Sequence, residues 1–249
     1  MTKKSSEVRH RALAWQRELA TLSALFAHLL AGLWHILDVH ELKRTQPVFI
    51  AACQDLTIKW AEVAAVMAAE YYAAMRSASG VAGTAPGLGA PSLPVLDQIA
   101  AEVKWATKDL WGATPELAAA KKLAEGALTR LAIDAPARQT VIDLVEQDHQ
   151  ALAWSRIAGD SHPCSFCAML ISRGPIFRSE AKADFRAHDN CKCLAVPVFS
   201  KSDAALLWSQ ELADAWARVT AGLHGKNAIK EWRRWYDHGG AAELAADIP

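Results

Sequence analysis

Between Leu19 and Leu37 the chain carries no Asp, Glu, Lys or Arg, and its large apolar residues recur three and four positions apart. This spacing predicts an amphipathic helix, with Ala, Ser and His on the side opposite the apolar stripe. An uncharged run of this length is also long enough to cross a membrane. However, Thr21, Ser23 and His28 interrupt it. We therefore interpret it as a buried helix and expect no membrane contact.

The first third of the chain is expected to form a helical hairpin. One long helix is predicted over residues 6–38 and a second over Val48–Met75, directly after Pro47. Only a short polar link separates them, and two helices joined in this way usually pack antiparallel. Residues 1–76 are therefore predicted to be an N-terminal helical unit.

Residues 77–96 differ sharply from the hairpin in composition. They contain four glycines, three prolines and no charged residue. Proline and glycine at this density are incompatible with a continuous helix. The segment is predicted to be a linker or an extended arm.

Helical patterns resume over residues 97–157. Three helices are expected here, over Leu96–Trp111, Pro115–Leu131 and Pro136–Ile157. In the last two, a proline falls in the first turn, which is a common way for a helix to begin.

The remainder divides into an irregular segment and a helical end. Residues 158–200 are rich in Gly, Pro, Asp and Asn, and short apolar runs between them predict two to four short strands. Residues 201–249 are predicted to contain helices over Ser202–Leu223 and Asn227–Tyr236.

Four of the five cysteines fall within this irregular segment. Cys164 and Cys167 form a C-x2-C pair, and His188, Cys191 and Cys193 follow after a gap of twenty residues. Zinc prefers four tetrahedral ligands drawn from thiolate and imidazole. Two paired clusters at such a separation are typical of zinc sites. We predict that this segment binds one Zn²⁺ ion. The remaining cysteine, Cys53, is expected to be a buried apolar side chain.

The cluster offers five ligands for four positions. Cys164, Cys167 and His188 are the best supported ligands, and the fourth is Cys191 or Cys193. Only one residue separates these two cysteines, so both could bind the metal only if the backbone between them formed a tight turn. A site closed by four protein ligands is structural, and its metal contributes directly to folding. The alternatives are a pair of disulfides or free buried thiols.

These features give the expected fold class. It is mainly α, with a long helical N-terminal region, a small zinc-stapled α+β lobe of short strands, and C-terminal helices.

The second cysteine pair also carries a resemblance to a known family. The segment His188-Asp189-Asn190-Cys191-Lys192-Cys193, preceded by the C-x2-C pair, resembles the phage Mu F-like family of minor head proteins, which end their shared domain in a segment like His-Pro-Asn-Cys-Arg-Cys. Here Asp189 and Lys192 replace the proline and the arginine. The stretch from Cys167 to Phe177 looks especially like versions from tailed phages of actinobacteria. The specific match covers roughly residues 150–200.

The resemblance implies a structural role. Such a protein is a virion component of the phage head, assembled in the host cytoplasm and present in few copies. Its expected partners are the portal or major capsid protein, further copies of itself, and packaged DNA. Some relatives carry a toxin domain after this region, but the roughly 50 residues that follow Phe199 are too few for one.

Two enzymatic alternatives were weighed. A capsid maturation protease would pair Cys164 or Cys191 with His162 or His188. However, a thiolate bound to zinc is not a free nucleophile, and no G-x-S-x-G signature is present. A metal-dependent nuclease would rest on the short match His188-Asp189-Asn190, whose histidine is better explained as a zinc ligand.

A DNA-contacting packaging or ejection factor is a further alternative. Lys+Arg and Asp+Glu both total 27, so the chain as a whole does not attract polyanions and any contact must be local. Near the C-terminus, basic and aromatic residues alternate, a mixture that can bind nucleic acid or an acidic protein. The residues are Lys226, Lys230, Trp232, Arg233, Arg234, Trp235 and Tyr236. The simplest interpretation is a helix docked by its aromatic residues with its charges in water.

Overall fold

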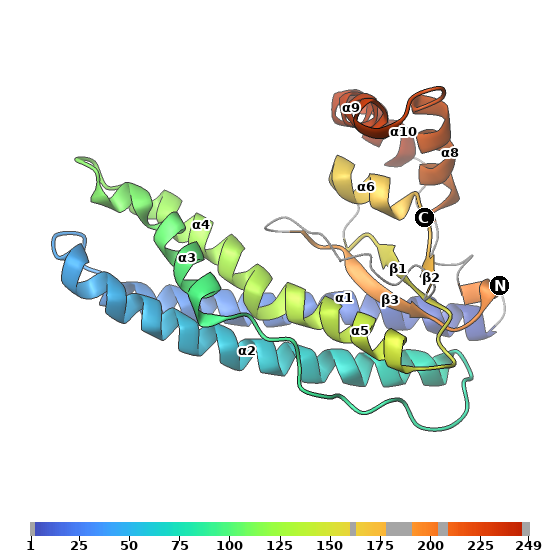
Figure 1. Cartoon of the computed structure of the whole chain (residues 1–249), viewed down its shortest axis with the longest axis horizontal. Coiled ribbons are helices and arrows are strands. Elements are labelled where there is room, and N and C mark those ends of the chain that lie inside the picture. The colour runs from blue at the N-terminus through green and yellow to red at the C-terminus, as the bar shows by residue number, and fades with distance from the viewer. Residues whose placement is uncertain (1–2, 160–162, 178–190, 204–208, 246–249) are drawn as a thin grey trace.

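A long helical bundle carries a smaller lobe at one end, with a short sheet between them (Figure 1). The structure is a computed structural model that describes residues 3–159, 163–177, 191–203 and 209–245. Helices dominate these residues, so the predicted mainly α fold class is confirmed.

The predicted antiparallel hairpin forms the base of the bundle. Helix α1 (Lys3–Leu33) continues into a 3₁₀ turn η1 (Trp34–Ile36), and α2 (Leu42–Ala78) runs back along it. The order of the ring contacts shows the antiparallel arrangement, because Trp15 stacks on Tyr71 near one end of the hairpin and Trp34 packs on Phe49 near the other.

Helix α2 begins earlier than predicted. The sequence suggested a start after Pro47, but the helix begins at Leu42 and Pro47 lies in its second turn. Pro47 therefore lies inside the helix, where it removes the backbone N–H that would donate to the Lys43 carbonyl. The backbone N–H groups of Arg44 and Thr45 donate to the Glu41 carbonyl and close the first turn.

The buried face of α1 is largely as predicted, since Leu19, Leu22, Phe26 and Leu30 are all within the core. On its outer side, residues such as Leu25 remain exposed. Among the described residues, one helical stretch, Glu7–Ile36, has the length and apolar composition needed to cross a membrane, and 33% of its most apolar window is buried. Core helices of soluble proteins pass the same test, so the expectation of no membrane contact stays a prediction.

A third layer lies on the hairpin. It contains α3 (Leu96–Ala106), a 3₁₀ turn η2 (Lys108–Trp111), α4 (Leu117–Thr129), a π-helical turn η3 (Arg130–Asp134) and α5 (Ala135–Gln147). The last three are continuous, so the predicted helix start at Pro136 is wrong. The wider π turn accommodates the proline ring without ending the helix.

The predicted helix over Pro136–Ile157 is also wrong at its C-terminal end. Helix α5 stops at Gln147, and Ala153–Ile157 is strand β1. It is the central strand of a three-stranded antiparallel sheet of order β2-β1-β3, with β2 at Ile176–Phe177 and β3 at Leu194–Val198. Strand β1 is buried over most of its length although it contains Ser155 and Arg156, so its five residues show no alternation of apolar and polar residues that would have predicted a strand.

A buried ion pair ties the uncharged arm to the bundle. The Arg76 Nε donates to Asp148 Oδ2 at 2.9 Å, and the Tyr72 hydroxyl donates to the same oxygen at 3.0 Å. The Arg76 Nη1 also donates to the Gly83 carbonyl at 2.6 Å, at the start of the arm. Further along, the Gln54 side chain donates to the Leu96 carbonyl, so the arm is held against α2 near both ends.

The small lobe, which we define as α6, α8, α9 and α10, has a hydrophobic core of its own. Its elements are α6 (Ser165–Ile171), α8 (Gln210–Val219), α9 (Gly225–Trp235), a π turn η5 (Tyr236–Gly240) and α10 (Ala241–Ala245). The helices predicted over Ser202–Leu223 and Asn227–Tyr236 correspond to α8 and α9, and α8 is much shorter than expected within the described residues.

Candidate metal centre

Three cysteine sulfurs converge between the sheet and the small lobe. Cys167 lies on α6, whereas Cys191 and Cys193 immediately precede β3. Their Sγ atoms all lie within 4.8 Å of one another, and the Cys167 and Cys191 sulfurs are 3.5 Å apart. The three side chains are 2%, 2% and 3% exposed. Chain segments 24 residues apart in sequence therefore bring their thiols to one buried point.

Both cysteines of the C-x-C pair take part. The sequence suggested that either Cys191 or Cys193 would reach a metal, but the structure places both sulfurs in the cluster. The turn that allows this is fixed by Arg138 on α5, whose Nε donates to the Cys193 carbonyl at 2.8 Å and whose Nη2 donates to the Cys191 carbonyl at 2.5 Å. These two hydrogen bonds hold the backbone between Cys191 and Cys193 in a tight turn, and that turn lets both sulfurs reach the cluster.

The other two predicted ligands, Cys164 and His188, are not part of the three-sulfur cluster that the structure describes. Cys164 is the N-cap residue of α6 and is exposed; its sulfur accepts a hydrogen bond from the Cys167 backbone N–H at 3.4 Å. It lies beside the cluster and is not one of the three mutually close sulfurs. His188 and the spare His162 lie outside the described residues, so the fourth position has two candidates, Cys164 and His188.

Two buried arginines accompany the sulfurs, and sequence analysis did not identify either. Besides Arg138, Arg156 on β1 places its Nη1 3.9 Å from the Cys167 sulfur. Arg138 and Arg156 are each 4% exposed. Nearby positive charge stabilises thiolates over thiols. An arginine inside a short apolar segment, as in Trp154-Ser155-Arg156-Ile157, is the signal that could have drawn attention to it.

The three thiols share protons. Hydrogen bonds from Cys167 and Cys193 hold the pKa of Cys191 far below its usual range, with the positive charge of Arg138 as a further cause. The pKa of Cys167 is raised, chiefly because it donates hydrogen bonds to Cys191 and Cys193 and because it is buried. Metal ligands must be deprotonated, so a divalent cation that bound here would take the place of the thiol protons of this hydrogen-bonded cluster.

The arrangement fits zinc better than nucleophilic catalysis. Three clustered sulfurs with a fourth donor nearby match the ligand set of a structural zinc site. No disulfide joins the five cysteines, all of which lie in the described residues, and a 3.5 Å sulfur separation is far longer than the roughly 2.05 Å of a disulfide. A sulfur as buried as that of Cys191 is closed to a polypeptide substrate, which argues against Cys191 as a protease nucleophile, whereas Cys164 is exposed.

Comparison with known proteins places the chain among phage proteins. Residues 4–222 match the model of a family described as VG15 protein. The chain belongs to the VG15 family. It is 27% identical to the gene 15 protein of Mycobacterium phage L5 over 84% of this chain and 86% of that protein. It is 25% identical to the gene 15 protein of Mycobacterium phage D29 over 57% of this chain and 70% of that protein.

No solved structure matches this VG15 family chain. Its family membership shows a phage-encoded protein, located in the host cell or in the virion. These matches do not test the narrower Mu F-like resemblance.

Gly159 is a structural requirement of the candidate centre in this VG15 family chain. A Cβ atom added there would lie 1.6 Å from the Lys192 carbonyl oxygen, between Cys191 and Cys193. Backbone cannot move aside as a flexible side chain can, so Gly159→Ala is expected to displace the C-x-C turn and destabilise the protein by about 1–3 kcal/mol.

Urea unfolding of Gly159→Ala against wild type measures this effect. Gly112→Ala is the matched control, because its Cβ would make an ordinary 3.5 Å contact with the Asp109 carbonyl. Equal stability of the two variants would show that the turn does not depend on the close approach of Gly159.

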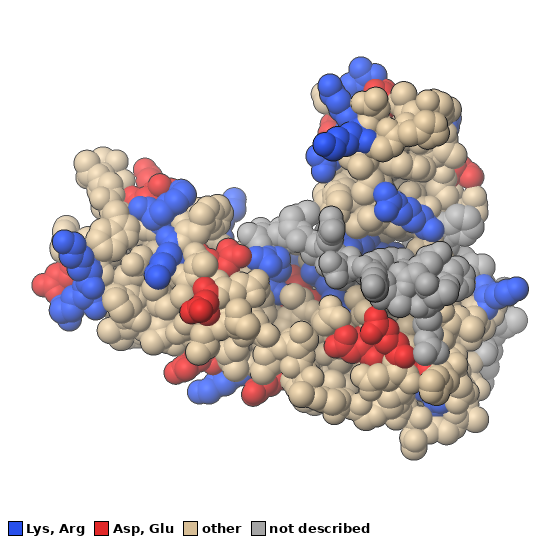
Figure 2. Space-filling model, viewed as in Figure 1, with Lys and Arg blue, Asp and Glu red and all other residues tan. Residues whose placement is uncertain are grey.

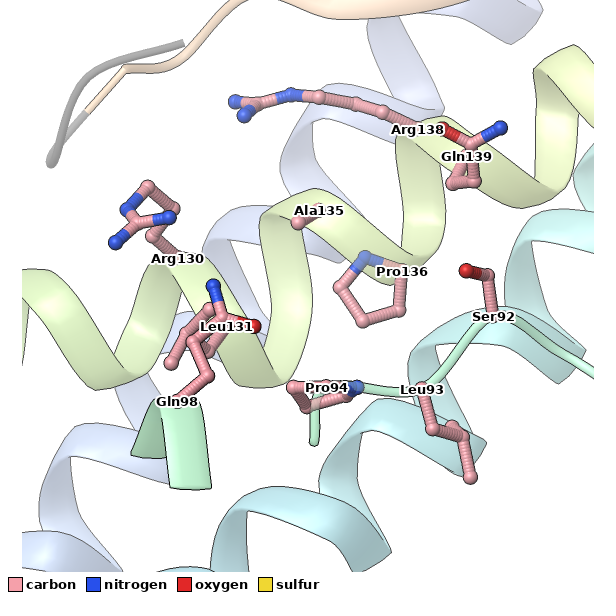
Figure 3. A pocket seen from close by; sticks show the side chains of 10 residues that line it. All are labelled: Ser92, Leu93, Pro94, Gln98, Arg130, Leu131, Ala135, Pro136, Arg138 and Gln139. Atoms are coloured by element: carbon pink, nitrogen blue, oxygen red, sulfur yellow. The ribbon is translucent and has the colours of Figure 1, made fainter. Parts of the chain in front are cut away.

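A separate pocket lies where the arm crosses the π turn η3. It encloses a cavity of about 230 Å³, lined by arm residues such as Ser92 and Pro94 and by helix residues such as Arg130, Pro136 and Arg138. In Figure 3 the two arginine side chains point away from Ser92 and Pro94. Arg130 donates to Glu102 and Arg138 donates to the cysteine carbonyls, so both charges are already engaged. None of the other described residues that line the pocket is charged.

Proposed function

We propose that the chain is a structural minor protein of a phage head, of the Mu F-like type, whose small lobe is folded around one zinc ion. The observation that carries this proposal is the buried cluster of Cys167, Cys191 and Cys193. These three sulfurs, with Cys164 or His188 as the fourth ligand, close the site to substrate. A closed site of this kind stabilises a fold and performs no reaction.

The cysteines also belong to the small lobe's core. Cys167, Cys191 and Cys193 pack with Leu212, Ala215, Trp232 and Tyr236 in one cluster of buried residues. That cluster is much smaller than the core of the bundle. Small lobes with limited apolar cores commonly depend on a metal or disulfide for stability. Zinc would therefore join α6 to the strand β3 and support the C-terminal helices.

A role in assembly is supported by the shape and surface of the bundle. Its free end, where η2 joins α3 to α4, projects away from the small lobe (Figure 1). Trp105 and Trp111 are 46% and 49% exposed there. Exposed tryptophans are enriched at protein interfaces. The portal protein, the major capsid protein and further copies of this chain are the proposed partners.

Metal analysis of the purified protein tests the zinc site. We expect about one zinc per chain in protein prepared without added metal, and loss of that zinc in Cys193→Ser. Cys53→Ser is the matched control, because Cys53 is equally buried but lies within the bundle, and it is expected to retain the metal. Metal-free wild-type protein with reactive clustered thiols would contradict the zinc site and reopen the Cys/His protease alternative.

Mass spectrometry of purified phage particles tests the head assignment. The protein is expected in DNA-filled heads at a few copies per particle, and in empty heads that have not yet packaged DNA. If it occurs in the infected-cell lysate but in neither kind of particle, the structural role is wrong, whatever the metal content.

A further inference from the structure

Helix α9 separates its aromatic and basic residues onto opposite sides. Trp232 is fully buried, and its Nε1 donates to the Ser165 carbonyl on α6 at 2.7 Å. Tyr236, just after the helix, is 7% exposed and donates to the Pro163 carbonyl. Trp235 is partly buried, with the Arg218 guanidinium 5.2 Å above its ring. Trp232 and Tyr236 therefore serve the core, and Trp235 is partly covered by Arg218.

The basic residues lie on the outer side of the same helix. Lys226, Lys230, Arg233 and Arg234 are all exposed and follow one another at intervals of four, three and one residues. That spacing aligns them along one face. Arg234 pairs with Glu231, whereas the other three make no ion pair within the described part of the chain. Figure 2 shows Lys and Arg gathered at the outer end of the small lobe, over α9.

We propose that this basic face, defined as Lys226, Lys230, Arg233 and Arg234, binds the phosphate backbone of duplex DNA without sequence preference. At about 1.5 Å per residue the four side chains span roughly 12 Å of helix, a length over which duplex DNA presents several phosphates. Cationic side chains on a helix contact phosphates in a sequence-independent way. The inference rests on the proposed function, because a head protein faces packaged duplex DNA.

The surface of the small lobe favours duplex DNA over single strands and over a membrane. Binding to single strands relies on exposed aromatic side chains on which bases stack, whereas Trp232 and Tyr236 are buried and Trp235 is partly buried. Insertion into a membrane requires exposed apolar residues beside the charges. In the described part of the small lobe and its connecting turns, one large hydrophobic residue is exposed, Leu223 at 38%, just before α9. The exposed side of α9 itself presents charged and polar side chains, which suits a duplex backbone.

Fluorescence anisotropy of the full chain with a 25-base-pair duplex of arbitrary sequence tests this proposal. We expect weak binding. The logarithm of the association constant should fall with the logarithm of the salt concentration at a slope of about −3, since each neutralised phosphate contributes about −0.9. The triple variant Lys226→Gln/Lys230→Gln/Arg233→Gln is expected to lose at least about tenfold in affinity at low salt and most of the salt slope. The matched control, Lys43→Gln/Lys59→Gln/Lys122→Gln, removes the same charge from the exposed surface of the bundle and is expected to bind like wild type.

Four results would overturn the proposal. Three of them are no binding at low salt, equal loss in the two triple variants, and tighter binding to single strands than to duplex. Equal affinity for vesicles of an anionic phospholipid would do so too, as it would show non-specific attraction to negative charge. Failure of the proposed function can be distinguished from failure of this inference. A protein absent from particles that still binds duplex through the basic face contradicts the proposed function alone. A protein found in heads whose basic face does not bind contradicts this inference alone.

Discussion

Removal of zinc by a strong chelator is expected to unfold the small lobe and leave the helical bundle folded. Structural zinc contributes about 10–16 kcal/mol to the folding of zinc-finger peptides near neutral pH. That contribution exceeds the total stability of many domains. The bundle has a large core of its own that includes none of the three clustered cysteines, so it does not depend on the metal.

Tryptophan fluorescence and far-ultraviolet circular dichroism separate the two parts. Trp232 is fully buried in the small lobe and lies 5.3 Å from Trp216, so unfolding of the small lobe should shift its emission to longer wavelength. Most of the helical dichroism should persist, because the longest helices, α1 and α2, are in the bundle. Cys193→Ser should mimic chelation and Cys53→Ser should not. An unchanged emission after complete metal removal would show that the small lobe is stable without zinc.

Breaking the buried ion pair is expected to destabilise the bundle by about 3–5 kcal/mol. Arg76 and Asp148 are 3% and 5% exposed, and Asp148→Ala would leave the guanidinium buried without its carboxylate. Uncompensated buried charge is among the most costly changes a protein can suffer. Glu7→Ala is the control, because its pair with Arg11 is about half exposed and such pairs are worth at most about 0.5 kcal/mol. Urea unfolding at neutral pH measures both.

The same pair predicts a dependence of stability on pH. Burial raises the pKa of Asp148, but hydrogen bonds from the Gln150 backbone N–H and from Arg76 and Tyr72 outweigh it and hold that pKa below its usual value. A carboxyl group with a lowered folded-state pKa stabilises the protein fully above the unfolded-state pKa, which is about 3.9 for aspartate. That stabilisation is lost as the pH falls from about 4 through the folded-state value.

Asp148→Asn isolates this pH effect from the loss of packing. The variant should be less stable than wild type at pH 7. The difference should shrink as the pH falls from about 4 through the lowered folded-state pKa of Asp148, because protonation removes the charge that the variant lacks. A stability difference that stays constant from pH 7 to pH 3 would show that the Asp148 charge contributes nothing to folding.

Local sequence patterns determined much of the helical framework. Apolar residues at helical spacing predicted the hairpin of α1 and α2, because burial on one face follows directly from the 3.6-residue period. Glycine and proline density predicted the irregular arm between Ala78 and Leu96, since these residues cannot sustain a helix. The predictions failed where a neighbour outweighed a local signal. Pro136 marks a helix start in sequence, yet the π turn η3 carries the helix through it.

For the candidate centre, the type and spacing of the ligands could be identified from the sequence, which predicted Cys167, Cys191 and Cys193 near a metal. What local spacing could not decide was which sulfurs meet. That depends on Arg138, which is 53 residues from Cys191 in sequence and holds the C-x-C turn through its two carbonyls. It also depends on Gly159, whose missing side chain lets the Lys192 backbone pass. Only the tertiary structure brings these distant groups together, because hydrogen bonding and close packing act across space and leave no periodic trace in the sequence.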